Sequence, residues 1–145
     1  MSKVIAVDPG KYKCGIVFAD LEKKLVNEAI VIKTDMLSNY IKKISQNQYE
    51  LIILIGNGTS SKKLITLLSG FEYRIIIVEE KNSTYRAKKR YFELFPLIGI
   101  KSFLPREIFI INKNLDALAA LVILEDFLNC KFEITDLIDI KTWMK

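Results

Sequence analysis

The chain has 145 residues and a mass of 16.7 kDa, and its 22 basic and 17 acidic residues give a formal charge of +5. This length fits one domain, and a composition that is 50% hydrophobic and 27% charged excludes a disordered or fibrous chain. No apolar run approaches the ~20 residues that a membrane span needs, and residues 1–10 lack the apolar stretch of a signal peptide. We therefore expect a soluble, cytoplasmic protein.

The residue types that the chain lacks narrow its possible chemistry. It contains no histidine, which excludes Ser-His-Asp and Cys-His nucleophiles and histidine-ligated zinc. Its two cysteines, Cys14 and Cys130, are too few for a disulfide framework or a zinc site. Any catalysis must therefore use carboxylates, lysines, hydroxyl groups or a metal held by oxygen. The isoelectric point of about 9.1 agrees with a polyanionic partner.

The first third of the chain has the pattern of a three-stranded meander. Residues 3–7 form a mostly apolar run, typical of a strand buried on both faces, and it ends at an Asp-Pro-Gly turn. Two further apolar runs follow at residues 15–19 and 25–32. The links between the three runs are too short for parallel crossovers, so they favour antiparallel hairpins.

After the meander, helical and strand patterns alternate. The spacing of apolar residues predicts, in chain order, a helix over residues 35–47, buried strands over 51–55 and 74–78 with a helix through Leu68 between them, and helices over 84–95 and 115–128. Residues 97–113 have no regular pattern, and residues 131–145 are ambiguous, with the spacing of a short amphipathic helix near the end. No linker or repeat divides the chain, so we expect a single domain over residues 1–145, with 129–145 as a C-terminal extension.

This order of elements predicts an α/β fold with a five-stranded mixed sheet, in which three antiparallel strands are followed by two parallel ones and helices flank the sheet. That is the ribonuclease H-like architecture. A flavodoxin-like fold is the alternative, and the two differ mainly in the opening hairpins.

Acidic residues follow two of the strands predicted to be buried. Asp8 closes the first strand, and Glu79 and Glu80 follow the strand at residues 74–78. Ligands and catalytic groups gather at the carboxyl ends of parallel strands, so these acids are candidate site residues. Side chains alternate along a strand, so only one of the two glutamates should face such a site.

Asp116 is a third candidate, at the start of the last predicted helix. Helical spacing puts it on one stripe with Ala119, Ala120, Ile123 and Phe127, which should face the sheet. A buried carboxylate needs a cation or a hydrogen-bond partner. Capping of the helix is the alternative role for an acid in the first turn.

Four ordered segments resemble the YqgF family of the RuvC/ribonuclease H-like superfamily. They are VIAVDPGKYKCGIVFAD from Val4, LIILIGNGTSSKKL from Leu51, VEEKNSTYRA from Val78 and LDALAALVILEDFL from Leu115. The second is closer to the related domain of Tex-type transcription factors, in its GNGT form. The resemblance implies a nuclease whose catalytic acids are Asp8, Glu80 and Asp116, and hydrolysis that leaves a 5′-phosphate and a 3′-hydroxyl.

The chain also departs from the family pattern. Lys81 stands where the family has arginine, which removes bidentate phosphate contact. Residues 56–58 replace a proline-containing loop, and residues 94–112 are longer than in common bacterial forms. These differences leave open whether the substrate is a precursor ribosomal RNA end or a branched DNA junction, and whether the protein is a monomer or a homodimer.

Three carboxylates from separate elements suit a hard cation, so we expect a two-ion Mg²⁺ or Mn²⁺ site formed by Asp8, Glu80 and Asp116. Basic residues near these acids are candidates for nucleic-acid contact: Lys11, Lys13, Lys62, Lys63, Lys81, Arg86 and Arg90. Arg86 and Arg90 lie one helical turn apart and are expected to be exposed. The alternative function is a non-catalytic module of the same fold that binds nucleic acid or a protein.

Overall fold

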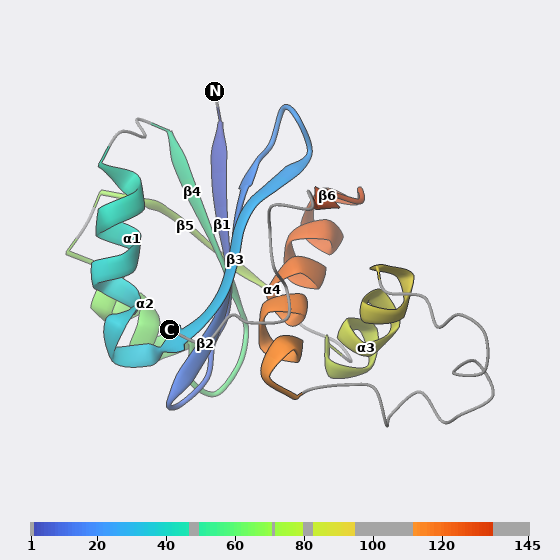
Figure 1. The fold of residues 1–145 in the computed structure, drawn as a ribbon. Helices are drawn as coiled ribbons and strands as arrows, with labels where there is room; N and C mark the ends of the chain where they lie inside the picture. The colour runs from blue at the N-terminus through green and yellow to red at the C-terminus, as the bar shows by residue number, and fades with distance from the viewer. Residues whose placement is uncertain (1, 47–49, 71, 80–82, 95–111, 135–145) are drawn as a thin grey trace.

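The computed structural model describes residues 2–46, 50–70, 72–79, 83–94 and 112–134 (Figure 1). The strands are β1 (Lys3–Asp8), β2 (Lys13–Asp20), β3 (Leu25–Lys33), β4 (Leu51–Gly56), β5 (Arg74–Val78) and β6 (Glu133–Ile134). The helices are the 3-10 helix η1 (Thr34–Met36), α1 (Leu37–Ser45), α2 (Ser61–Leu68), α3 (Ser83–Leu94) and α4 (Asn112–Leu128). Among the described residues, no helix is both long enough and apolar enough to cross a membrane.

The described strands form one mixed sheet in the order β5-β4-β1-β2-β3-β6. β1, β2 and β3 pair as an antiparallel meander, whereas β4 and β5 continue the sheet from β1 as parallel strands. The prediction of a mixed α/β sheet is confirmed, and the antiparallel meander excludes the flavodoxin-like alternative. The predicted number of five strands is wrong, because β6 pairs with β3 at the far edge. Two residues are too few to give a strand pattern in the sequence.

Helices cover both faces of the sheet (Figure 1). α1 and α2 lie on one face, α4 lies on the other, and α3 packs against α4. Alternation along β1 separates two cores, since Ile5 and Val7 pack with α1 and α2, while Val4 and Ala6 pack with α4. Even-numbered positions of β1 therefore face α4, which decides where Asp8 points.

Several predicted elements differ from the observed ones in their limits or surroundings. The helix expected over residues 35–47 is divided into η1 and α1, and the last helix begins at Asn112, three residues before the predicted start. β5 was expected to be buried, but it is an edge strand among the described strands, and Ile77 is 42% exposed. A strand with one neighbour in the sheet is less shielded from solvent than a strand with a neighbour on each side. Residues 95–111 and 135–145, including the proposed short helix near the end, lie outside the described residues.

Candidate active site

The candidate site begins with Asp8, at the carboxyl end of β1. As an even-numbered residue it continues the α4-facing row of Val4 and Ala6. In the antiparallel ladder Asp8 is paired with Gly15 of β2. Residues paired in this way have Cα atoms about 4.5–5.5 Å apart, so whatever packs on Gly15 lies next to Asp8.

The start of α4 packs directly on Gly15. A Cβ atom placed on Gly15 would lie 1.8 Å from the carbonyl oxygen of Asp116 and 2.7 Å from the backbone nitrogen of Ala117. Only a residue without a side chain allows this approach. The small residue that permits this approach lies on β2 and not on the helix. Through Gly15 the fold brings Asp8 and Asp116, 108 positions apart in the chain, to one place.

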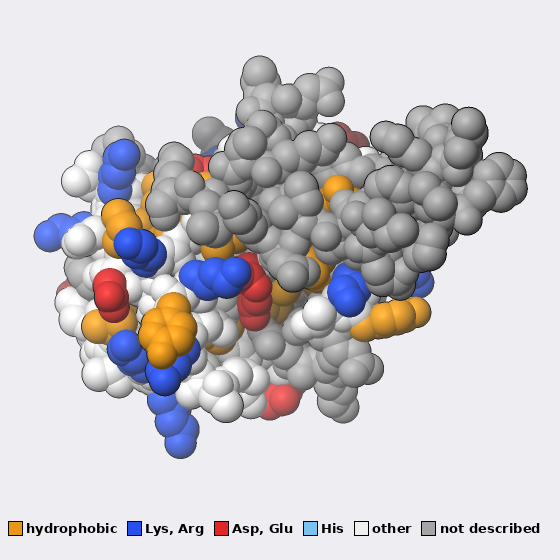
Figure 2. Space-filling model, turned by 60° about the horizontal axis from the view of Figure 1, so that its bottom comes forward, with side chains coloured by type: hydrophobic (Ala, Val, Ile, Leu, Met, Phe, Trp, Pro, Cys, Tyr) orange, Lys and Arg blue, Asp and Glu red, His pale blue; other side chains and the backbone are white. Residues whose placement is uncertain are grey.

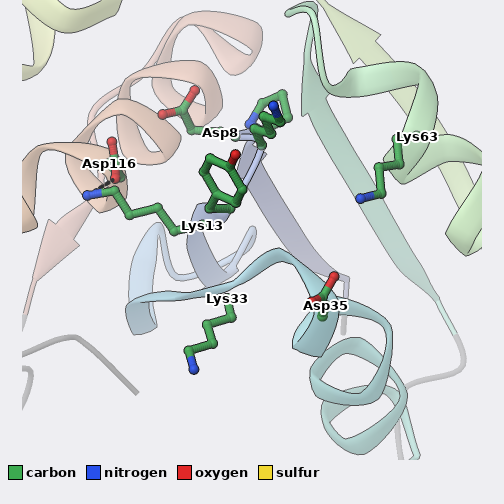
Figure 3. Close-up of a pocket in the computed structure, with 10 residues that line it drawn as sticks. Asp8, Lys13, Lys33, Asp35, Lys63 and Asp116 are labelled. Atoms are coloured by element: carbon green, nitrogen blue, oxygen red, sulfur yellow. Dashed lines mark ion pairs between the residues drawn. The ribbon is translucent and has the colours of Figure 1, made fainter.

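A cavity of about 770 Å³ opens at this end of the sheet, with Asp8 and Asp116 both in its wall. Its charged lining consists of three aspartates and four lysines: Asp8, Asp35, Asp116, Lys11, Lys13, Lys33 and Lys63. Figure 3 shows Asp8 and Asp116 on the α4 side, with Lys63 and Asp35 on the side of α2 and η1. On the same end of the molecule, Lys and Arg side chains gather around acidic ones (Figure 2). The cavity thus combines three carboxylates, two of them the predicted site acids Asp8 and Asp116, with four lysines.

Asp116 carries an oxygen that its surroundings satisfy only in part. The Oδ2 atom is buried and accepts no well-oriented hydrogen bond from a described residue, although the ammonium group of Lys13 lies 3.2 Å away as an ion pair (Figure 3). Both observations hold, because an ammonium group can be close enough for Coulomb attraction without the alignment that a hydrogen bond needs. Lys13 therefore supplies positive charge to Asp116, and lone-pair capacity remains unused.

Thr34 of η1 holds the turn between β1 and β2 by two hydrogen bonds. The hydroxyl group of Thr34 donates to the carbonyl oxygen of Gly10 at 2.9 Å, and its backbone N–H donates to the carbonyl oxygen of Tyr12 at 2.9 Å. The thiol group of Cys14 lies 3.4 Å from the same hydroxyl. Burial raises the pKa of the Cys14 thiol, and the charges of Asp8 and Asp116 add to that rise. Cys14 is therefore a neutral core residue, and both carboxylates are close enough to raise the pKa of its thiol.

The third predicted acid, Glu80, and the neighbouring Lys81 lie outside the described residues. Val78 of β5 packs with the core under α4, whereas the next residue, Glu79, accepts a hydrogen bond of 2.9 Å from the side-chain amide of Asn57. Glu79 does not line the cavity. Accordingly, within the described ranges no group of three acidic or cysteine side chains is placed to hold a metal ion.

Only some of the basic residues predicted to contact nucleic acid lie at the cavity. Lys11, Lys13 and Lys63 line the cavity, but Lys62, also on α2, does not. Arg86 forms an ion pair with Asp126. Arg90 contacts Glu125 at 2.9 Å, and their side chains are only 11% and 5% exposed.

The expectation that Arg90 is an exposed charge is therefore wrong. Glu125, near the end of α4, is buried as well. Its carboxylate also accepts the backbone N–H of Phe132 at 2.8 Å. This network joins α3, α4 and the segment before β6.

Sequence reasoning missed three residues that line the cavity: Tyr12, Lys33 and Asp35. Two signals were available for them. Tyr12 stands between two lysines directly after the Asp-Pro-Gly turn. Lys33 is paired with Lys13 across the β2–β3 hairpin, a register that the meander implies but does not fix.

No family model matches the sequence, and no curated protein matches it. Two solved structures of RuvC from Thermus thermophilus are similar in fold. One is RuvC in complex with a Holliday junction substrate, at 11% identity and a TM-score of 0.52, covering 92% of this chain and 100% of that one. The other, of RuvC from the same organism, has 10% identity and a TM-score of 0.50, covering 90% and 99%.

The chain has the ribonuclease H-like fold. At 10–11% identity this likeness establishes the fold alone.

Proposed function

We propose that this chain is a divalent-metal-dependent nuclease of the YqgF type that hydrolyses phosphodiester bonds of structured nucleic acid. One observation carries the proposal: the end of β1 and the start of α4 place Asp8 and Asp116 in the wall of one lysine-lined cavity. The fold shared with RuvC, one of whose structures holds a Holliday junction substrate, supports nucleic acid as the partner.

The donor set of the cavity fits Mg²⁺ or Mn²⁺. Asp8 and Asp116 offer hard oxygen ligands from two separate elements, and the buried Oδ2 atom of Asp116 has lone-pair capacity unused by the described residues. Glu80 is the proposed third ligand, on the basis of its sequence segment. Such ions, when bound, activate a water molecule and neutralise charge on the phosphate.

The remaining residues of the cavity have roles that their own chemistry defines. Lys11, Lys33 and Lys63 would attract and hold the phosphate backbone, since each ammonium group is a strong point charge for phosphate. Lys13 would hold Asp116 in place through their ion pair. Lys62, Lys81, Arg86 and Arg90 remain proposed backbone contacts on sequence grounds, and Arg90 is the weakest of them because Glu125 already uses its charge.

The substrate proposal includes a precursor ribosomal RNA end and a branched DNA junction. Both are tested by incubating the protein with structured RNA and with a four-way DNA junction, each with Mn²⁺, with Mg²⁺ and with EDTA. We predict that Asp8→Asn abolishes hydrolysis and leaves nucleic-acid binding intact or stronger. The amide keeps the shape of the side chain but removes the negative charge that would hold a cation and repel phosphate.

Glu72→Gln is the matched control, because it makes the same carboxylate-to-amide change at an exposed residue that does not line the cavity. We expect Glu72→Gln to cleave at the wild-type rate. Cleavage by Asp8→Asn at the wild-type rate in the same ion would show that the proposed site is wrong.

The ion pair between Lys13 and Asp116 favours a second candidate, a nucleic-acid-binding module without activity. In that case Lys13 takes the place of a cation at Asp116, and the basic surround serves binding alone. The same assay separates the two: a module binds the RNA or the junction without cleaving it in any divalent ion, and Asp8→Asn then changes nothing but affinity.

A further inference from the structure

The side chain of Tyr12 is an exposed aromatic ring at the edge of the cavity. It is 76% exposed, although it lies only four residues after Asp8 and in the same cavity lining. Its hydroxyl group makes no hydrogen bond to a described residue, and the ring's contact is with Lys11, whose ammonium nitrogen lies 5.2 Å from the ring centroid. An exposed tyrosine gains little from such a position in the folded protein alone, because its apolar ring stays in water.

The backbone under this ring is held firmly. Thr34, itself buried, donates to the carbonyl oxygens of Gly10 and Tyr12, one on each side of Lys11. The turn is also tight at Gly10, where a Cβ atom would lie 2.1 Å from the carbonyl oxygen of Lys13. The ring is therefore presented to solvent from a fixed point close to Asp8 and to the Lys13–Asp116 ion pair.

We propose that Tyr12 is a stacking platform for an unpaired nucleobase of a nucleic acid bound in the cavity. Aromatic side chains beside basic ones are the usual means of binding single-stranded nucleic acid, because every base has a π-face and every nucleotide a phosphate. One ammonium group can cover only one face of the ring, so Lys11 leaves the other face for a base. The lysines of the cavity are then placed for the phosphates on either side of the stacked nucleotide.

This inference rests on the proposed function and narrows its substrate class. In a continuous duplex the faces of the bases are stacked on one another, so a tyrosine ring can reach only a base that is unpaired or extruded. The favoured substrates therefore have an unpaired nucleotide beside the bond to be cut, as at a strand end or a branch point.

A protein partner fits the same ring less well. The centres of protein interfaces are depleted of charged residues, lysine in particular. Tyr12 lies between Lys11 and Lys13 in sequence, and Lys33 and Lys63 line the same cavity. These lysines favour a polyanion over a protein as the partner of Tyr12.

The test measures binding without cleavage, in EDTA, on the full chain. The probes are a short single-stranded oligonucleotide that carries 2-aminopurine, whose fluorescence reports stacking, and a blunt duplex of the same sequence. We expect Tyr12→Ala to weaken single-strand binding by about 5- to 150-fold, the effect of losing one base–aromatic stack. Duplex affinity and the dependence of binding on salt stay at wild-type values, because no charge is removed. Tyr12→Phe keeps the ring and should keep both the affinity and the fluorescence change.

Tyr85→Ala is the control, since Tyr85 is 70% exposed on α3 and does not line the cavity. Equal losses for Tyr12→Ala and Tyr85→Ala, equal losses on single strand and duplex, or no loss at all would each overturn the proposal. A change in oligomeric state of Tyr12→Ala with unchanged single-strand binding would overturn it too, in favour of a second copy as the occupant.

Failure of the stacking proposal is distinguishable from failure of the nuclease. If the wild-type protein cleaves in Mn²⁺ but Tyr12→Ala binds normally, only the stacking proposal is wrong. If Tyr12→Ala behaves as expected but no divalent ion supports cleavage, stacking holds and the enzymatic proposal is wrong.

Discussion

Replacing Gly15 by alanine tests whether the close approach of α4 to β2 builds the candidate site. The new Cβ atom would lie 1.8 Å from the carbonyl oxygen of Asp116, whereas ordinary van der Waals contact begins at 3.4 Å. The start of α4 must therefore move by roughly 1.6 Å, since the opposing atoms belong to backbone and cannot rotate away as a flexible side chain can.

Two effects follow from this displacement. Overpacking of a well-packed interior costs about 1–3 kcal/mol, which for a chain of this size lowers the melting temperature by roughly 2–12 °C. Asp116 also moves away from Asp8, and a misplacement of about 1 Å costs on the order of 100-fold in rate at an active site. We expect Gly15→Ala to fold, to melt earlier and to cleave about 100-fold more slowly.

The assay pairs thermal unfolding followed by circular dichroism with the cleavage assay in Mn²⁺. Gly70→Ala is the control, because no atom lies within 4 Å of a Cβ atom at that position. Its melting temperature should be unchanged or slightly higher, since alanine restricts the unfolded chain. A wild-type melting temperature for Gly15→Ala would refute the packing argument. A lowered melting temperature with a wild-type rate would refute the role of Asp116.

Two further predictions concern residues outside the cavity. Arg90→Ala leaves the buried carboxylate of Glu125 without its cation, so the free energy of unfolding measured in urea should fall by about 3–5 kcal/mol. Arg86→Ala, whose partner Asp126 is exposed, should lower it by less than about 1 kcal/mol, and similar losses for the two variants would contradict the burial argument. The hydrogen bond from Lys3, with that from the backbone N–H of Lys23, holds the pKa of Asp20 at about 2, below its ordinary value. The stability that this pair contributes is therefore present above about pH 4 and lost as the pH falls toward 2, and urea midpoints of Asp20→Asn should fall less steeply in that range than those of wild type.

The central strands could be predicted from the sequence because they are buried on both faces. Residues 3–7 and 51–55 are nearly continuous apolar runs, and short links fixed the antiparallel pairing of the first three strands. Features that depend on single long-range contacts could not be predicted in this way. β6 has two residues, and a hydrogen bond of 2.8 Å from the backbone N–H of Glu133 to the carbonyl oxygen of Lys24 helps to hold it beside the start of β3.

Helical spacing predicted the existence of α4 but not its buried face, since Phe127, expected to face the sheet, is 44% exposed. This helix is covered by the sheet on one side and by α3 on the other, so residues all around it are buried. The pattern of apolar residues then does not indicate which side of the helix faces the sheet. Glu125 shares a face with Leu118 and Leu121, a spacing that could have indicated burial, but its partner Arg90 lies 35 residues away.

The candidate site illustrates the same limit. The sequence singles out Asp8 and Asp116 because acids beside apolar runs are unusual, yet nothing in either segment says that they meet. The residue that brings them together is Gly15, which the antiparallel ladder pairs with Asp8 and on whose bare Cα the first turn of α4 rests. A glycine inside a strand pattern marks a close approach of another backbone. In this chain that signal, combined with a carboxylate paired across from it, predicts which acids share a cavity better than the acids do by themselves.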